Sequence, residues 1–135
     1  MANTHFSGPV TVGSGRMETI TAAKILNSDD NGKTFLLNGT GGGAITLPPV
    51  ASSSGFKCKF IVASLFTTNW VITAQTAVLY GVIMELSTAQ LVSTGTTLTM
   101  LNATDTIGDW IEVESDGINW YVSGNFAQAL SITPA

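Results

Sequence analysis

Residues 32–34, Gly-Lys-Thr, match the last three positions of a phosphate-binding loop, in which backbone N–H groups and a lysine surround phosphate oxygens. The first glycine of such a loop is missing, because Asn27 stands at its position. Asp29 would lie where the anionic phosphate belongs, and residues 35–37, Phe-Leu-Leu, suit a strand instead of the required helix. The pattern therefore does not predict a nucleotide site.

The same stretch resembles the spacing of a calcium loop, with oxygen-bearing side chains at Asn27, Asp29 and Asn31 followed by Gly32. Its first position lacks the usual aspartate, and Asn38 replaces the closing bidentate glutamate. Asp, Asn and Gly are also the residues of ordinary turns. We predict a turn that leads into a strand, with no bound metal and no cofactor; a weak surface cation is the alternative.

Nucleophilic catalysis has few candidate residues. The only histidine, His5, lies in the N-terminal stretch, far from an orienting partner in the sequence. The single cysteine, Cys58, excludes an internal disulfide and a multi-thiolate metal site, and it falls on the apolar face of a predicted strand. The carboxylates Glu112 and Glu114 fall on a solvated strand face, which lacks the desolvation that general acid or base catalysis needs. We predict no catalytic residue and no enzyme activity.

The aromatic residues offer a different chemistry, the stacking of a sugar ring. Trp110 and Tyr121 are predicted to share an outer strand face, whereas Trp120 is predicted to lie in the core. Trp110 and Tyr121 are therefore the candidate ligand-facing aromatics of a carbohydrate- or receptor-binding module.

The elements that must position these residues are strands. In residues 56–62 the apolar side chains alternate with Lys57 and Lys59, and residues 69–74 are β-branched and aromatic. Residues 109–115 and 118–123 flank Asp116-Gly117, so we predict a hairpin with a two-residue turn. That turn places Val113 opposite Trp120 and Ile111 opposite Val122, on one apolar face. The pattern predicts an all-β fold, an antiparallel β-sandwich or a compact barrel.

Composition limits the partners. Of the 135 residues 10% are charged and 44% are hydrophobic, and the net charge is −4. The five basic residues are scattered, which argues against nucleic-acid binding. No apolar run is long enough for a membrane helix, and no signal peptide is recognisable, so we expect synthesis in a cytoplasm. A weakly charged surface suits a protein that packs against copies of itself or a partner.

We divide the chain into an extended N-terminal arm (1–20), a β domain (21–127) and a C-terminal tail (128–135). Residues 2–16 are small, polar and glycine-rich, and too poor in apolar residues to fold alone. Their anchors for another surface are spaced along an extended chain: Phe6, Pro9, Val10 and Val12.

The segments NGKTFLLN, GAITLPP, GFKCKFIV, NWVITA and DWIEVESDGINWYVSGNF, in this order, resemble a β module of virion proteins of tailed bacteriophages. The resemblance covers roughly Gly32 to Phe126. Such modules occur on capsid decoration (cement) proteins, head fibres and tail fibres. A small chain with an N-terminal arm is most similar to a decoration protein.

The resemblance implies a structural virion protein on the outside of a phage capsid, made in the host cytoplasm. Its expected partners are the major capsid protein and further copies of itself in a homotrimer, with neither nucleic acid nor membrane. It would stabilise contacts between capsomers. The alternative is a carbohydrate- or receptor-binding module of a head or tail fibre.

Overall fold

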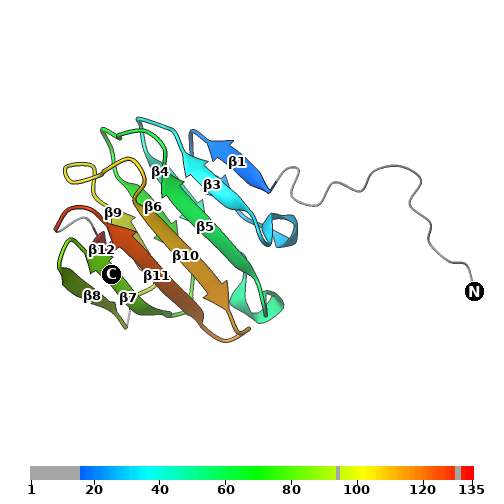
Figure 1. Cartoon of the computed structure of the whole chain (residues 1–135). Coiled ribbons are helices and arrows are strands. Elements are labelled where there is room, and N and C mark those ends of the chain that lie inside the picture. Colours follow the sequence, from blue (N-terminus) through cyan, green and yellow to red (C-terminus); the bar gives the residue numbers. More distant parts are fainter. Residues whose placement is uncertain (1–15, 94, 130–131) are drawn as a thin grey trace, which may run out of the picture.

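Two β-sheets packed face to face form the molecule (Figure 1). The computed structural model describes residues 16–93, 95–129 and 132–135. Strands make up 48% of the described residues, and no helix among them reaches seven residues. The predicted all-β sandwich is confirmed.

One sheet has seven strands, in the spatial order β1 (Met17–Ile20), β3 (Thr34–Leu37), β5 (Lys57–Val62), β10 (Trp110–Ser115), β11 (Trp120–Phe126), β7 (Leu79–Glu85) and β8 (Thr88–Val92). The other has five, in the order β12 (Ile132–Pro134), β9 (Thr97–Met100), β6 (Trp70–Thr73), β4 (Gly43–Thr46) and β2 (Lys24–Ile25). Two short 3₁₀ turns complete the described elements, η1 (Ser28–Asp30) and η2 (Val50–Ser52).

The first six strands alternate between the sheets, so β1, β3 and β5 lie in one and β2, β4 and β6 in the other. Each strand therefore pairs with the strand two places away in sequence, and these pairs are parallel. β11 and β7 are parallel as well. The sheets are thus mixed, which corrects the predicted antiparallel pairing. Each of the first strands crosses to the other sheet before the chain returns, and such a crossover connection permits parallel pairing where a short hairpin would not.

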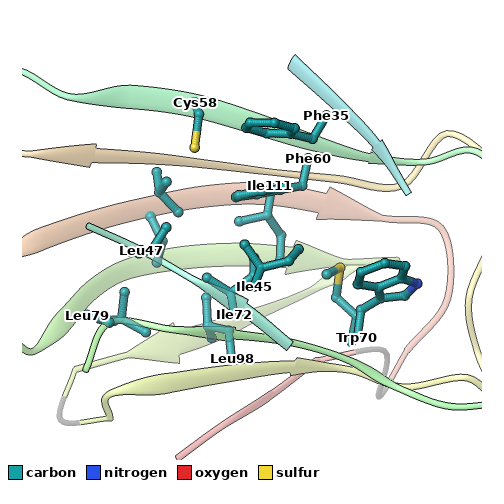
Figure 2. Close-up of a cluster of buried hydrophobic side chains, with 14 of the residues drawn as sticks. Phe35, Ile45, Leu47, Cys58, Phe60, Trp70, Ile72, Leu79, Leu98 and Ile111 are labelled. Atoms are coloured by element: carbon teal, nitrogen blue, oxygen red, sulfur yellow. The ribbon is translucent and has the colours of Figure 1, made fainter. Parts of the chain in front are cut away.

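The core fills the space between the sheets, where alternate side chains of both sheets meet (Figure 2). The rings of Phe35 and Phe60 stack with centroids 5.5 Å apart, and Phe56 meets Trp120 edge-on at 5.7 Å. Trp70 is fully buried in the five-stranded sheet. The inward face predicted for residues 56–62 is confirmed, since its four apolar side chains are all buried.

The hairpin of β10 and β11 forms, but with a wider turn than predicted. Ser115 pairs with Trp120, and Val113 with Val122, so four residues make the connection. The carboxylate of Asp116 accepts the backbone N–H groups of Ile118 and Asn119, both at 2.7 Å, which holds the wider turn. Because the register shifts by two residues, the side chains keep their faces and Trp120 is in the core as predicted.

Both predicted domain boundaries shift outward. Residues 17–20, assigned to the arm, form β1 and pair with β3. Residues 132–134, assigned to the tail, form β12 and pair with β9. Each of these strands buries one isoleucine, Ile20 or Ile132, which is too weak a pattern to recognise in sequence. The predicted arm anchors at residues 6, 9, 10 and 12 lie outside the described residues.

We expect Gly81→Ala to destabilise the fold by at least about 2 kcal/mol. Gly81 has φ of +152°, and a Cβ there would lie 1.9 Å from the backbone oxygen of Val122 on the neighbouring strand. Neither backbone can move without breaking the pairing of β7 with β11.

The matched control is Gly41→Ala, where a Cβ meets nothing within 4 Å. Urea unfolding followed by tryptophan fluorescence measures both variants. Equal stability of the two would contradict the close approach of β7 and β11.

Candidate functional site

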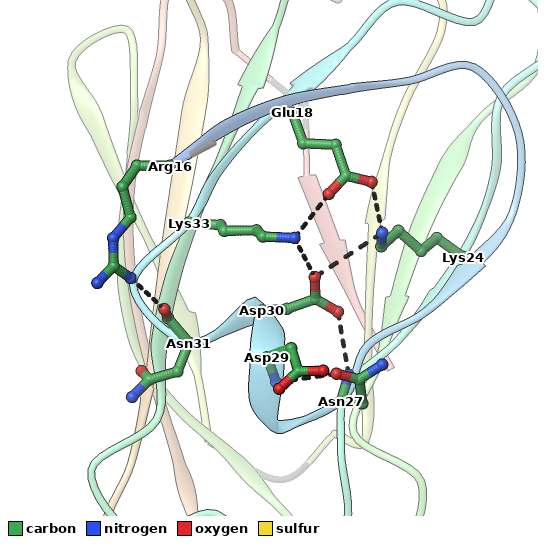
Figure 3. Close-up of polar contacts among 8 residues, drawn as sticks. All are labelled: Arg16, Glu18, Lys24, Asn27, Asp29, Asp30, Asn31 and Lys33. Carbon is green, nitrogen blue, oxygen red and sulfur yellow. Dashed lines mark hydrogen bonds and ion pairs between the residues drawn. The ribbon is translucent and has the colours of Figure 1, made fainter. Parts of the chain in front are cut away.

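The stretch that resembled two ligand loops is a capped turn (Figure 3). The Asn27 side chain accepts the backbone N–H of Asp29 at 2.9 Å, and the Asp30 carboxylate accepts that of Asn27 at 3.1 Å. This reciprocal capping closes η1, and Gly32 follows with φ of +80°. The prediction of a turn that leads into a strand is confirmed by β3, which starts at Thr34.

Ion pairs use the charged side chains of this stretch (Figure 3). The Lys33 ammonium donates to Asp30 and to Glu18, at 2.9 Å each, and Lys24 donates to Glu18. Asp30 is 3% exposed, and it also pairs with Lys24. The network ties β1 and β2 to the turn before β3, so the lysine and carboxylates have a structural use.

The pKa values of the network follow from these contacts. Hydrogen bonds from Lys24 and Lys33 hold the pKa of Glu18 below its ordinary value. Hydrogen bonds to Asp30 and Glu18 raise the pKa of Lys33. Each charge stabilises its neighbour, so the network favours the folded protein between mildly acidic and mildly alkaline pH.

Cys58 is buried on the inner face of β5, as its strand pattern predicted. Burial raises the pKa of its thiol, so the thiolate that a nucleophile needs does not form near neutral pH. His5 lies outside the described residues. In the described part of the chain, no three or more His, Cys, Asp or Glu side chains gather closely enough for a metal ion.

Trp110 lines an open hollow of about 400 Å³ at one end of the sandwich, with walls from the loop before β10 and from the end of β11. The buried carboxylate of Asp109 fixes these walls, because it accepts the backbone N–H groups of Thr106 and Ala127 at 2.9 Å. Burial raises the pKa of Asp109. The Lys59 ammonium lies 4.5 Å from the Trp110 ring centroid. The hollow combines an indole with a carboxylate and the side-chain amide of Asn125.

Tyr121 shares the outer face with Trp110, as predicted, but not its hollow. Trp110 pairs with Asn125 and Tyr121 with Glu114, so the two aromatics are four residues apart along the hairpin. At about 3.3 Å per residue that is roughly 13 Å, too far for one sugar ring to touch both. Tyr121 instead donates from its hydroxyl to Asp116 at 2.9 Å, and its ring lies 6.5 Å from that of Tyr80.

An exposed apolar surface that the sequence analysis missed lies on the outer side of the seven-stranded sheet. Its side chains alternate along β7 and continue onto the two adjacent strands. They are 40% to 64% exposed. We call this surface the β7–β8 face; its residues are Tyr80, Val82, Met84, Leu91 and Tyr121.

The register brings these residues together. Tyr80 lies opposite Tyr121 on one side, and Val82 lies opposite Leu91 on the other. The polar neighbours Ser123 and Asn125 are uncharged. The sequence carries one signal that is compatible with the face: residues 79–84 are apolar at both odd and even positions, apart from Gly81, so β7 has two apolar sides.

A larger hollow of about 490 Å³ lies between η1 and η2 and has an uncharged lining that includes Asn27, Ser53 and Phe56. Its polar groups serve local structure. Asn27 caps η1, and the Ser53 hydroxyl donates to the Pro49 carbonyl at 2.7 Å. These hydrogen bonds account for the polar side chains around the hollow, so the hollow gives no indication of a ligand.

Comparison with known proteins adds no identity to this geometry. The sequence matches no protein-family model, and no curated protein matches it. Within the described residues, no helix has the length and apolarity that crossing a membrane requires.

We expect Glu18→Gln to reduce the acid sensitivity of the fold. The folded-state pKa of Glu18 is depressed, so its contribution is present above the unfolded pKa of about 4.3 and is lost as pH falls through the folded value. The contribution is at most about 1 kcal/mol, because the side chain is partly exposed.

Urea unfolding of the wild type and Glu18→Gln at pH 7 and near pH 3 measures the effect. The variant should be less stable at pH 7, and the difference should shrink at pH 3. A constant difference at both values would show that the ion pairs do not stabilise the fold.

Proposed function

We propose that this chain is a structural virion protein, a decoration or cement protein that binds the outside of a phage capsid and stabilises contacts between capsomers. The observation that supports it most is the β7–β8 face, an exposed apolar surface on a sandwich that has few charges, because such a surface suits a protein that works in an assembly. Large exposed apolar patches mark surfaces where other proteins bind. The resemblance of the strand segments to a virion β module supplies the class of partner.

The proposed stabilisation of the capsid depends on many copies of the protein making the same contact. Burial of apolar area is worth about 25 cal/mol per Å², so a modest contact repeated over a whole shell adds greatly to the cost of separating capsomers. The protein needs no chemistry for this role. It needs a stable body and surfaces that bind, and it would be localised on the capsid surface of the virion.

The N-terminal arm provides the proposed contact with the major capsid protein, through Phe6, Pro9, Val10 and Val12. An extended segment binds a surface by main-chain hydrogen bonds and by pockets for alternate side chains. Arg16, where the described chain begins, leads directly into β1 at one end of the seven-stranded sheet. The arm therefore starts at the sheet edge farthest from β8.

We propose a homotrimer, because closed rotational symmetry lets each copy place its arm on a different shell subunit. Neighbouring strands lie about 4.8 Å apart, which puts β1 and β8 roughly 29 Å from each other across the seven strands. Copies joined near β8 would thus hold their arms well apart. This separation suits a protein that bridges the joints between capsomers.

We expect deletion of residues 2–15 to leave a folded body that binds capsids at least tenfold more weakly. The deletion ends before Arg16, whose guanidinium donates to the Asn31 carbonyl at 2.6 Å and belongs to the folded body. Co-sedimentation with purified empty shells of the virus that encodes the chain measures the binding.

A second variant keeps the arm length and replaces Phe6, Val10 and Val12 with serine. It should bind as weakly as the deletion if the apolar anchors act, and far-ultraviolet circular dichroism should match the wild type for both. Full capsid binding by the truncated chain would refute the role of the arm.

The second candidate function is recognition of a carbohydrate by a head or tail fibre. The hollow at Trp110 favours it, because an aromatic ring beside the side-chain amide of Asn125 offers both stacking and hydrogen bonds to a sugar. The Thr106 hydroxyl oxygen there is buried, and no hydrogen-bond partner for it is present among the described atoms. In this candidate site a sugar would stack on Trp110 alone, because Tyr121 lies outside the hollow.

A glycan array distinguishes this candidate. If it is correct, the wild type binds a defined set of glycans, Trp110→Ala loses at least tenfold in affinity, and Tyr121→Ala retains it because Tyr121 lies outside the hollow. Equal losses in the two variants, or no glycan bound by the wild type, would exclude a carbohydrate site at Trp110.

A further inference from the structure

The two sheets end in four strands, β1, β8, β12 and β2, and β8 differs from the other three. An exposed edge strand invites pairing with another chain, and proteins protect such edges with short strands, charges or proline. β1 carries Glu18, β2 has two residues and Lys24, and β12 has three residues and Pro134. β8 has five residues, Thr-Ala-Gln-Leu-Val, with neither charge nor proline.

The unprotected edge adjoins the apolar surface. Leu91 of β8 is 64% exposed and lies beside Val82 in the β7–β8 face. The tip of the β7–β8 hairpin adds Leu86, which is exposed and has φ of +53°. Left-handed backbone favours glycine or asparagine, so an exposed leucine there does not serve local stability. The β8 edge, the β7–β8 face and Leu86 at the hairpin tip all expose groups to water that would be more stable if another chain covered them.

We propose that the β7–β8 face and the β8 edge are buried against a second copy of this chain. The inference identifies the self-association surface of the homotrimer, and rests on the proposed function only for the number of copies.

Charge favours a copy as the occupant. The chain has a net charge of −4, so two copies repel each other, and they approach most easily through a surface that has no charge. The part of the face around Val82, Met84 and Leu91, with its neighbours Ala89, Ser123 and Asn125, is neutral. Carboxylates adjoin the face only at its Tyr121 end, where Glu114 is the strand partner and Asp116 accepts the hydroxyl. A strongly charged partner would gain no electrostatic attraction there.

The position of the N-terminal arm agrees with this occupant. The arm begins beside β1, at the opposite end of the sheet, so burial of β8 in a contact between copies leaves the start of each arm uncovered. Association through β8 and shell binding through the arm can therefore occur in the same molecule.

The test is the mass of the purified full-length chain in the absence of capsids. Size-exclusion chromatography with light scattering should give a multiple of the 14.1 kDa chain mass for the wild type. Leu91→Glu should give the monomer mass, because a charge would be buried at the contact. The matched control Ile25→Glu, at a 76% exposed position on β2 of the other sheet, should keep the wild-type mass.

Leu91→Thr guards against a folding defect, since threonine suits an exposed strand position. It should fold with a wild-type circular dichroism spectrum and dissociate at a concentration at least tenfold higher than the wild type. Hydrogen exchange of residues 79–92 should slow as the wild-type concentration rises. A monomeric wild type would overturn the inference, as would an unchanged mass for Leu91→Glu or dissociation of Ile25→Glu to the same extent.

The outcome is separable from the proposed function. A wild-type multimer that dissociates in Leu91→Glu but binds no capsid leaves this inference intact and removes the decoration function. A monomer that loses capsid binding on Leu91→Glu reverses the assignment, with the face bound to the shell and not to a copy.

Discussion

The contact between the two sheets is the constraint on which the rest of the structure depends. Because the first six strands alternate between the sheets, neither sheet can be completed before the other has formed. Each parallel pair, such as β3 with β5, joins strands separated by a strand of the opposite sheet. The apolar side chains between the sheets are what make this arrangement favourable, since hydrophobic burial is the main driving force of folding. Pairing of this non-local kind makes the fold slow to form but compact once formed.

The polar residues whose spacing resembled ligand-binding or catalytic motifs stabilise the packing of the strands and turns. Asp30 caps η1 and pairs with Lys33, and Glu18 joins the same network from β1. Asp109 holds the loop before β10 against the segment after β11. Buried carboxylates with such partners hold the loops at the ends of the strands in place. The apolar side chains on the outer face of the seven-stranded sheet take no part in these contacts.

Period-two alternation predicts which side of a strand is buried, and it did so for residues 56–62 and for both strands of the β10–β11 hairpin. That prediction tolerates a wrong turn length, because a shift of two residues leaves each side chain on its face. The choice of neighbouring strands is different. The parallel pairs are made by residues distant in sequence, and β1 and β12 each bury a single isoleucine, so no local pattern reveals them.

The candidate site could likewise be predicted only in part, because alternation along a strand gives the face of a side chain but not its neighbours on other strands. The shared face of Trp110 and Tyr121 follows from their spacing, whereas their separation depends on the pairing register. The β7–β8 face could not be assigned before β7 had neighbours, because an apolar strand with two apolar sides reads equally well as a buried one. Only the packing of the second sheet against one face of the seven-stranded sheet shows that the other side of β7 is exposed.

The central claim is that the protein acts by repetition over a shell. Quantitative mass spectrometry of purified virions, from a phage whose genome carries this sequence, tests it most directly, by the ratio of this chain to the major capsid protein. A decoration protein is expected in hundreds of copies, in a fixed ratio to the shell subunits and present on heads that lack tails. A handful of copies that separate with the tail would contradict the claim.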